Sequence, residues 1–254
     1  MTSLCPPPSR IFCGREDILN KMHQFFSDTG IQHIYVLHGL GGAGKTQIAL
    51  KFINKSSSRF THIFFIDTCT IATIETGLKN IAVLKDFGNS PEDGLLWLTS
   101  KVEEWLLFFD NADDPDINLN DYIPQCNHGN IIITSRNPGM CVYAGSHSPV
   151  LDMEEEDAVA LLLKSALQKA TSSTEQITAE IVKVLYHLPL AVVQAGASLR
   201  KSSTMYQGIS FIPVVHPKKK YRSLWNSSHI FCGQLENGIL CSFWTLPMRS
   251  NLIH

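Results

Sequence analysis

The stretch from His33 to Phe52, HIYVLHGLGGAGKTQIALKF, constrains the fold of this chain more than any other part of the sequence. The apolar run at 34–37 predicts a strand, and the amphipathic pattern from Thr46 to Ile53 predicts a helix. Between them, Gly39 to Thr46 match the pattern G-x-x-x-x-G-K-[ST] at every fixed position. Because a strand precedes the glycines and a helix follows them, we interpret this segment as a phosphate-binding P-loop.

The residue types of this loop predict its chemistry. Glycines let the backbone wrap closely around an anion, and the following helix presents free N–H groups and its positive dipole end. Lys45 is expected to reach the β and γ phosphates of a nucleotide, and the Thr46 hydroxyl to ligate Mg²⁺. The nucleotide-binding residues predicted in this stretch are Gly39, Gly41, Gly42, Ala43, Gly44, Lys45, Thr46 and Gln47.

Two further apolar runs end in polar residues. The run from Trp105 to Asp110 predicts a strand buried on both faces, with Asp110 as the Walker B acid that holds Mg²⁺ together with Thr46. The alternative is a strand that merely runs into the turn-like residues 111–115. The run at 129–136 places Arg136 where it could contact a γ phosphate, although a solvated arginine is the alternative. The candidate catalytic residues are therefore Lys45, Asp110 and Arg136.

Strands and helices alternate over the first part of the chain. Residues 60–67 read as a strand, whereas residues 71–84 and 91–104 carry helical apolar spacing. This alternation predicts an α/β protein with a doubly wound parallel sheet, whose ligands bind at the carboxyl edge of the strands.

Composition excludes several other functions. The 254 residues carry a formal net charge of −2, so no overall basic field predicts nucleic-acid or membrane binding. No signal-type leader or membrane-length apolar run is present, so we expect a cytoplasmic protein. The seven cysteines include no CxxC pair, and their spacing indicates neither a zinc site nor a disulfide framework.

Two other P-loop classes lack their accompanying motifs. A guanine nucleotide-binding protein needs an NKxD motif after a DxxG, but the NKSS at 54–57 lacks the aspartate and no DxxG is present. The DFG tripeptide at 86–88 has no kinase-type catalytic loop to accompany it. A small-molecule kinase stays open in principle, although no lid or acceptor site is evident.

The order of the motifs resembles the NB-ARC group of STAND signalling ATPases, and most of all its fungal members with tetratricopeptide repeats. The resemblance covers roughly residues 8–201 and rests on FCGRE at 12–16, the P-loop, WLLFFDNADD, NIIITSRN and HLPLAVVQAGASL. It implies that residues 10–15, including Arg15, lie against adenine and that Pro189 packs near the nucleotide. It also implies that a helix from Glu154 to Lys169 begins a helical lid, which closes over ADP in the resting state.

Three departures from that family pattern affect the expected activity. Asn111 stands where many members have a second Walker B acid, and an amide cannot act as a general base, although Asp113 or Asp114 could substitute. His187 stands at the first glycine of the GLPLA-type motif, which puts the turn before Pro189 in question. The helical region is also expected to be cut short, because neither a winged-helix region nor a 34-residue repeat follows.

We therefore expect three segments. Residues 1–153 form the P-loop domain and residues 154–203 a short ARC-like helical segment. Residues 204–254 have neither strand nor helix periodicity, and we expect an irregular, poorly ordered tail from outside the ancestral reading frame, such as a retained intron.

The leading functional hypothesis is a switch that binds ADP or ATP with Mg²⁺ and hydrolyses slowly or not at all. A longer relative could use such a switch to control homo-oligomerisation. The alternatives are an active ATPase or phosphotransferase that uses Asp110 and a neighbouring carboxylate, and an inert truncated fragment that binds nucleotide without assembling.

Overall fold

The computed structural model describes residues 2–3, 5–28 and 30–201, and these belong to one compact unit, Met1–Lys201. The predicted tail, residues 204–254, lies outside the described residues. The proposed boundary between residues 153 and 154 stays a prediction.

A parallel sheet organises the first part of this unit. Its six strands lie in the order β1-β3-β4-β5-β2-β6, and every pairing is parallel. The strands are β1 (Thr2–Ser3), β2 (His33–His38), β3 (His62–Asp67), β4 (Trp105–Asp110), β5 (Asn130–Ser135) and β6 (Ser146–Pro149). All six residues of β4 and of β5 are buried, as expected for central strands that are covered on both faces. The predicted α/β fold with a P-loop is therefore confirmed.

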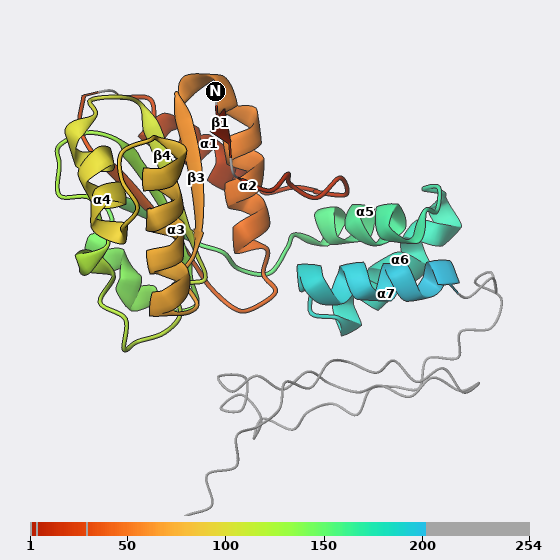
Figure 1. Ribbon diagram of the computed structural model, residues 1–254. Coiled ribbons are helices and arrows are strands. Elements are labelled where there is room, and N and C mark those ends of the chain that lie inside the picture. Colours follow the sequence, from red (N-terminus) through yellow and green to blue (C-terminus); the bar gives the residue numbers. More distant parts are fainter. Residues whose placement is uncertain (1, 4, 29, 202–254) are drawn as a thin grey trace, which may run out of the picture. The chain divides into compact units, whose positions relative to one another are not determined.

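Helices cover both faces of the sheet. Helices α1 (Glu16–Phe25) and α2 (Lys45–Lys55) share one hydrophobic core with the sheet, whereas α3 (Ile71–Leu84) and α4 (Pro91–Ser100) contribute to a second core. Figure 1 shows α3 and α4 along one face and α2 along the opposite face. Two cores separated by a sheet are what a doubly wound fold requires.

A third core belongs to the helices that follow the sheet. These are α5 (Glu155–Ala166), α6 (Ser172–Val184) and α7 (Pro189–Lys201). Buried Leu162, Val182 and Val192 meet in this core, and the partly buried Ile11 packs against it. In the described part of the chain, no helix combines the length and apolarity that crossing a membrane requires.

Two predicted helix ends are wrong, each for a local backbone reason. The helix predicted over 91–104 ends at Ser100, because Lys101 is extended (φ −102°, ψ 106°) and leads the chain into β4. The helix predicted from Glu154 to Lys169 runs from Glu155 to Ala166, because Leu167 adopts a left-handed conformation with φ 55°. Apolar spacing alone did not reveal these breaks.

The register of the strands brings the predicted polar residues to one edge. Asp67 lies opposite Asp110 in the β3–β4 pair, and His38 lies opposite Ser135 in the β2–β5 pair. The loops that leave these strands therefore converge at the carboxyl edge, which is where ligands bind in open α/β sheets.

Candidate nucleotide site

The P-loop joins β2 to α2 in a conformation that depends on glycine. Gly44 caps the N-terminus of α2 with φ 96°, and Gly42 has φ 80°. Both angles lie in the left-handed region, where a side chain would be strained. The loop and the first turn of α2 thereby form the kind of helix N-terminus that binds phosphate.

Lys45 is buried within this loop. It is 8% exposed, and its ammonium group donates hydrogen bonds to the carbonyl oxygens of Gly39 (2.9 Å) and Leu40 (3.0 Å). Burial lowers the pKa of Lys45, because desolvation disfavours the charged form, while the nearby Asp113 and Asp110 charges oppose that shift. Lys45 is thus hydrogen-bonded to neutral carbonyl oxygens, and the anionic oxygens of a phosphate, which are stronger acceptors, can replace them.

The carboxylate of Asp110 lies beside the first turn of α2. Its Oδ1 accepts hydrogen bonds from the hydroxyls of Thr46 (2.8 Å) and Thr134 (2.6 Å), and Asp110 is only 8% exposed. Three segments distant in sequence therefore meet here, namely α2, β4 and β5. We call Thr46, Asp110 and Thr134 the hydroxyl–carboxylate cluster.

A second polar group lies on the loops after β4 and β5. Arg136 donates to Asp113 twice, from its backbone N–H to Oδ1 and from Nε to Oδ2, each at 2.6 Å. Burial raises the pKa of Asp113, but these hydrogen bonds and the Arg136 charge outweigh that effect and hold it below its usual value. A Cβ atom on Gly41 would lie 3.7 Å from the Arg136 side chain, so this ion pair borders the P-loop.

The segment before α1 contacts the P-loop and the residues after β6. Arg15 donates from its guanidinium group to the carbonyl oxygens of Ala43 (3.4 Å), Leu151 (2.6 Å) and Asp152 (3.2 Å). The Ser9 N–H donates to the side-chain oxygen of Gln47 at 2.7 Å. The predicted adenine-binding segment, residues 10–15, is therefore connected to the P-loop through Arg15 at its end, and to α2 through Ser9 just before its start.

The N-terminal end of α7 lies against the same loop. The N–H of Leu190 donates to the Gly42 carbonyl oxygen at 3.2 Å, and a Cβ atom on Gly44 would lie 3.9 Å from Pro189. His187 adopts φ 51°, the left-handed conformation for which glycine is the usual residue. His187 therefore adopts the backbone conformation expected of glycine at this position, and Pro189 still lies next to the P-loop.

Comparisons with known proteins agree with these motifs. No family model matches the chain. A nucleotide-binding leucine-rich repeat (NLR)-like protein of Hyaloscypha variabilis is 28% identical over 224 residues, covering 75% of this chain and 22% of that protein. A probable disease resistance protein of Arabidopsis thaliana is 26% identical over 221 residues, covering 79% of this chain and 28% of its own length. The chain contains an NB-ARC/STAND-like domain.

This NB-ARC/STAND-like domain spans less than a third of the length of either curated relative. Among solved structures, the Drosophila ORC bound to DNA matches with a TM-score of 0.56 and 11% sequence identity. The match covers 78% of this chain and 57% of that chain, and at this identity it concerns the fold alone. The curated relatives indicate a nucleotide-binding module of the STAND type.

Sequence reasoning named most of the residues that the NB-ARC/STAND-like domain gathers around its P-loop. Lys45, Thr46 and Asp110 lie within the loop or beside it, and Arg15, Arg136 and Pro189 border it. Thr134 and Ser9 were missed. A threonine near the end of a buried strand and a serine in a proline-rich segment give no signal until the strand register and the chain path are known.

Proposed function

We propose that this NB-ARC/STAND-like domain is an adenine-nucleotide switch, which binds ADP or ATP with Mg²⁺ and hydrolyses slowly or not at all. One observation carries the proposal: the first turn of α7 is hydrogen-bonded directly to the P-loop, from the Leu190 N–H to the Gly42 carbonyl oxygen. This contact gives phosphate bound in the loop a direct route to the helical segment, and we infer that two positions of that segment bind nucleotide with different affinities.

The phosphate end of the site has a suitable set of donors and metal ligands. Lys45 and the N–H groups at the start of α2 supply positive charge, and Thr46 and Asp110 supply a hydroxyl and a carboxylate oxygen at hydrogen-bond distance. Hard oxygen ligands of this kind suit Mg²⁺, which usually retains water and bridges protein to phosphate. Bound Mg²⁺ supplies charge neutralisation for the phosphate oxygens.

Arg136 is the residue best placed to distinguish ATP from ADP. Its side chain is 58% exposed, it borders Gly41, and its partner Asp113 already neutralises it. An additional phosphate can compete with Asp113 for the guanidinium group, because both are anionic and accept hydrogen bonds. The competition makes the ion pair sensitive to the number of phosphates bound.

The carboxylate chemistry favours a switch over a rapid ATPase. Asn111 follows Asp110 directly, and its amide group donates to the Cys69 sulfur at 3.5 Å rather than offering a base. Asp113 is the nearest substitute, but Arg136 occupies both of its oxygens and holds its pKa low. A carboxylate with a lowered pKa is a weak base near neutral pH, so activation of water is inefficient.

Three residues support a base-binding role at the other end of the site. Arg15 and Gln47 connect the segment before α1 with the P-loop, and Pro189 approaches the loop from the helical segment. Adenine bound between these segments would hold them together. In a longer protein of this family, the same closure could control homo-oligomerisation.

The first experiment identifies the nucleotide. The full chain is purified under native conditions and then denatured, and chromatography of the released small molecules shows whether ADP or ATP is bound. Calorimetric titration of nucleotide-free protein with ADP, ATP and GTP in Mg²⁺ then gives affinities. Lys45→Ala is the test variant, and Lys55→Ala is the matched control at the far end of the same helix.

The outcomes separate the functional classes. About one adenine nucleotide per chain, lost in Lys45→Ala and retained in Lys55→Ala, supports the switch. Turnover of about 1 per second or more, in the range of kinases, contradicts slow hydrolysis and supports an active enzyme. A folded wild-type chain that binds no adenine nucleotide overturns the proposal.

A further inference from the structure

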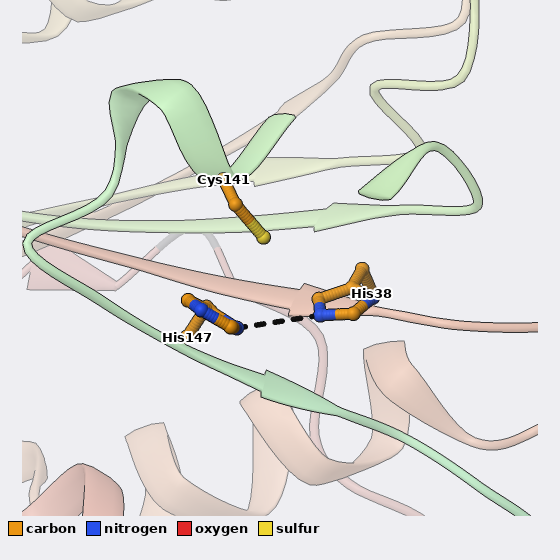
Figure 2. Close-up of side chains that lie close together, drawn as sticks. All are labelled: His38, Cys141 and His147. Atoms are coloured by element: carbon orange, nitrogen blue, oxygen red, sulfur yellow. Dashed lines mark hydrogen bonds between the residues drawn. The ribbon is translucent and has the colours of Figure 1, made fainter. Parts of the chain in front are cut away.

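A second cluster of ligating side chains lies next to the P-loop, outside the nucleotide site. His38 is the last residue of β2 and precedes Gly39, His147 lies in β6, and Cys141 lies in the 3₁₀ helix η3 (Pro138–Tyr143). One imidazole nitrogen from each histidine and the cysteine sulfur all lie within 4.8 Å of one another. Figure 2 shows the Cys141 sulfur pointing toward the gap between the two rings.

The separation of the two imidazoles fits a shared metal ion. His38 Nε2 lies 3.4 Å from His147 Nδ1, which is long for a direct hydrogen bond. Two nitrogens bound tetrahedrally to zinc at about 2.0–2.1 Å lie about 3.3–3.4 Å apart. The nitrogen pair therefore already has the spacing of two zinc ligands, and the Cys141 sulfur lies within 4.8 Å of a nitrogen of each ring.

The backbone around the cluster is well anchored. Strands β2 and β6 pair in parallel, with Val36 opposite His147 and His38 opposite Pro149. The Lys21 ammonium group donates to the backbone carbonyl oxygen of His147 at 2.6 Å. The Gly145 N–H donates to the Ile34 carbonyl oxygen at 3.0 Å, which fixes the end of the η3 connection against β2. All three ligands therefore come from segments with defined positions.

We propose that His38, Cys141 and His147 form a binding site for Zn²⁺, with the fourth position open to water or an external ligand. Two imidazoles and a thiolate form a donor set that zinc accepts and that Mg²⁺, which prefers oxygen, does not. Half-buried His38 and Cys141 form the inner wall, and exposed His147 leaves a path for the ion. The site shares no residue with the hydroxyl–carboxylate cluster, and the proposal does not rest on nucleotide binding.

The absence of a CxxC pair in the sequence does not bear on this site. His38 and Cys141 are 103 residues apart in the sequence (141 − 38), and the fold brings them together. A ligand set assembled across strands has no short spacing pattern to detect.

The test uses zinc and cobalt with the full chain. Protein freed of metal by a chelator is titrated with Zn²⁺ against a chromogenic competitor, with millimolar Mg²⁺ present throughout to occupy oxygen sites. Co²⁺ then serves as a spectroscopic probe, because a cysteine ligand gives a thiolate-to-metal charge-transfer band. Cys141→Ser and His147→Ala are the test variants, and Cys126→Ser is the matched control, another half-buried cysteine of the same unit.

The expected result is one zinc ion bound per chain at these residues. Each test variant should lose at least about tenfold in zinc affinity, the lower end of the loss seen when even outer-shell residues of metal sites are changed. Cys141→Ser should also abolish the Co²⁺ charge-transfer band, whereas Cys126→Ser should retain it. Circular dichroism identifies a variant that has not folded, and exposed His147 is the position where substitution is least disruptive.

Two results overturn the proposal. One is a folded wild-type chain that does not bind Zn²⁺ in competition with the chromogenic chelator. The other is zinc binding that all three variants reduce equally or leave unchanged, which would place the metal at other residues.

Discussion

Two acidic residues three positions apart are held by the P-loop site in opposite ways. Asp110 is 8% exposed and accepts hydrogen bonds from two neutral hydroxyls, those of Thr46 and Thr134. Asp113 lies on the following loop and is bound by a charged partner, Arg136, whose side chain is 58% exposed. The first carboxylate ends a central strand, and the second belongs to a segment without regular structure.

Under the proposed function, this difference assigns separate roles to the two carboxylates: Asp110 holds the ligand and Asp113 takes part in sensing it. The two hydrogen-bond partners of Asp110 are neutral hydroxyls, so its carboxylate stays available to a cation, while the strand fixes its position. The charge of Asp113 is already compensated by Arg136, and that pair can change partners when another anion arrives. The first carboxylate suits a constant Mg²⁺ ligand, and the second suits a state-dependent contact.

The largest expected effect comes from Asp110. Asp110→Ala leaves the buried Thr134 hydroxyl without its carboxylate acceptor, so we expect a loss of about 3 kcal/mol in unfolding free energy. Asp110→Asn keeps an acceptor oxygen and should cost about 1 kcal/mol or less. Both variants should lose the Mg²⁺-dependent part of the nucleotide affinity, measured by titration with and without Mg²⁺, while urea unfolding measures stability.

The asparagine variant separates structure from metal binding. If Asp110→Asn retains the Mg²⁺ dependence of nucleotide affinity, this carboxylate is not the metal ligand. If instead Asp110→Asn is as unstable as Asp110→Ala, the charge itself, rather than acceptance of hydrogen bonds, stabilises the strand end.

Arg136 should have an intermediate effect that depends on the nucleotide. Arg136→Ala would remove the proposed charge-assisted contact to the last phosphate, so the affinity for ATP should fall about tenfold, equivalent to 1.4 kcal/mol. The affinity for ADP should change by less than about twofold, because ADP lacks that phosphate. Calorimetric titrations of the same protein preparation with both nucleotides measure the ratio directly.

Arg136→Lys is the control for charge. It preserves the charge but not the planar geometry of the guanidinium group, so it should restore part of the ATP preference. An equal loss for ADP and ATP in Arg136→Ala would show that this residue supports the loop without sensing the third phosphate.

Local sequence was sufficient to predict the P-loop and the central strands. The loop needs glycines, lysine and threonine in one continuous segment, and a strand buried on both faces needs an unbroken apolar run such as Trp105–Asp110. These requirements act over a few residues, so they leave a pattern that is readable without knowledge of the fold.

The contacts between segments could not be predicted in the same way. Thr134 meets Asp110 because β4 and β5 are neighbours in the sheet, and Cys141 meets His38 because η3 returns beside β2. Helix ends were also hard to place, as the left-handed Leu167 after α5 shows. Such features depend on strand order and on backbone angles that several sequences can adopt.

The smallest expected effect is the pH dependence of stability that arises from Asp113. Its pKa is lowered in the folded chain, so its contribution is complete above the ordinary carboxyl value of about 3.9 and is lost as the pH falls through the folded value. Because the ion pair is largely exposed on the arginine side, Arg136→Ala should cost less than about 1 kcal/mol at pH 7.

Acidification should therefore make the wild type and Arg136→Ala converge in stability. Urea unfolding of both proteins from about pH 5 downward, through the folded pKa of Asp113, measures the difference, and Asp113→Asn should remove it at every pH. A difference that stays constant on acidification would mean that Arg136 stabilises the loop through packing rather than through the Asp113 charge. The exchangeable ion pair would then no longer distinguish this carboxylate from Asp110, and the assignment of separate sensing and holding roles would fail.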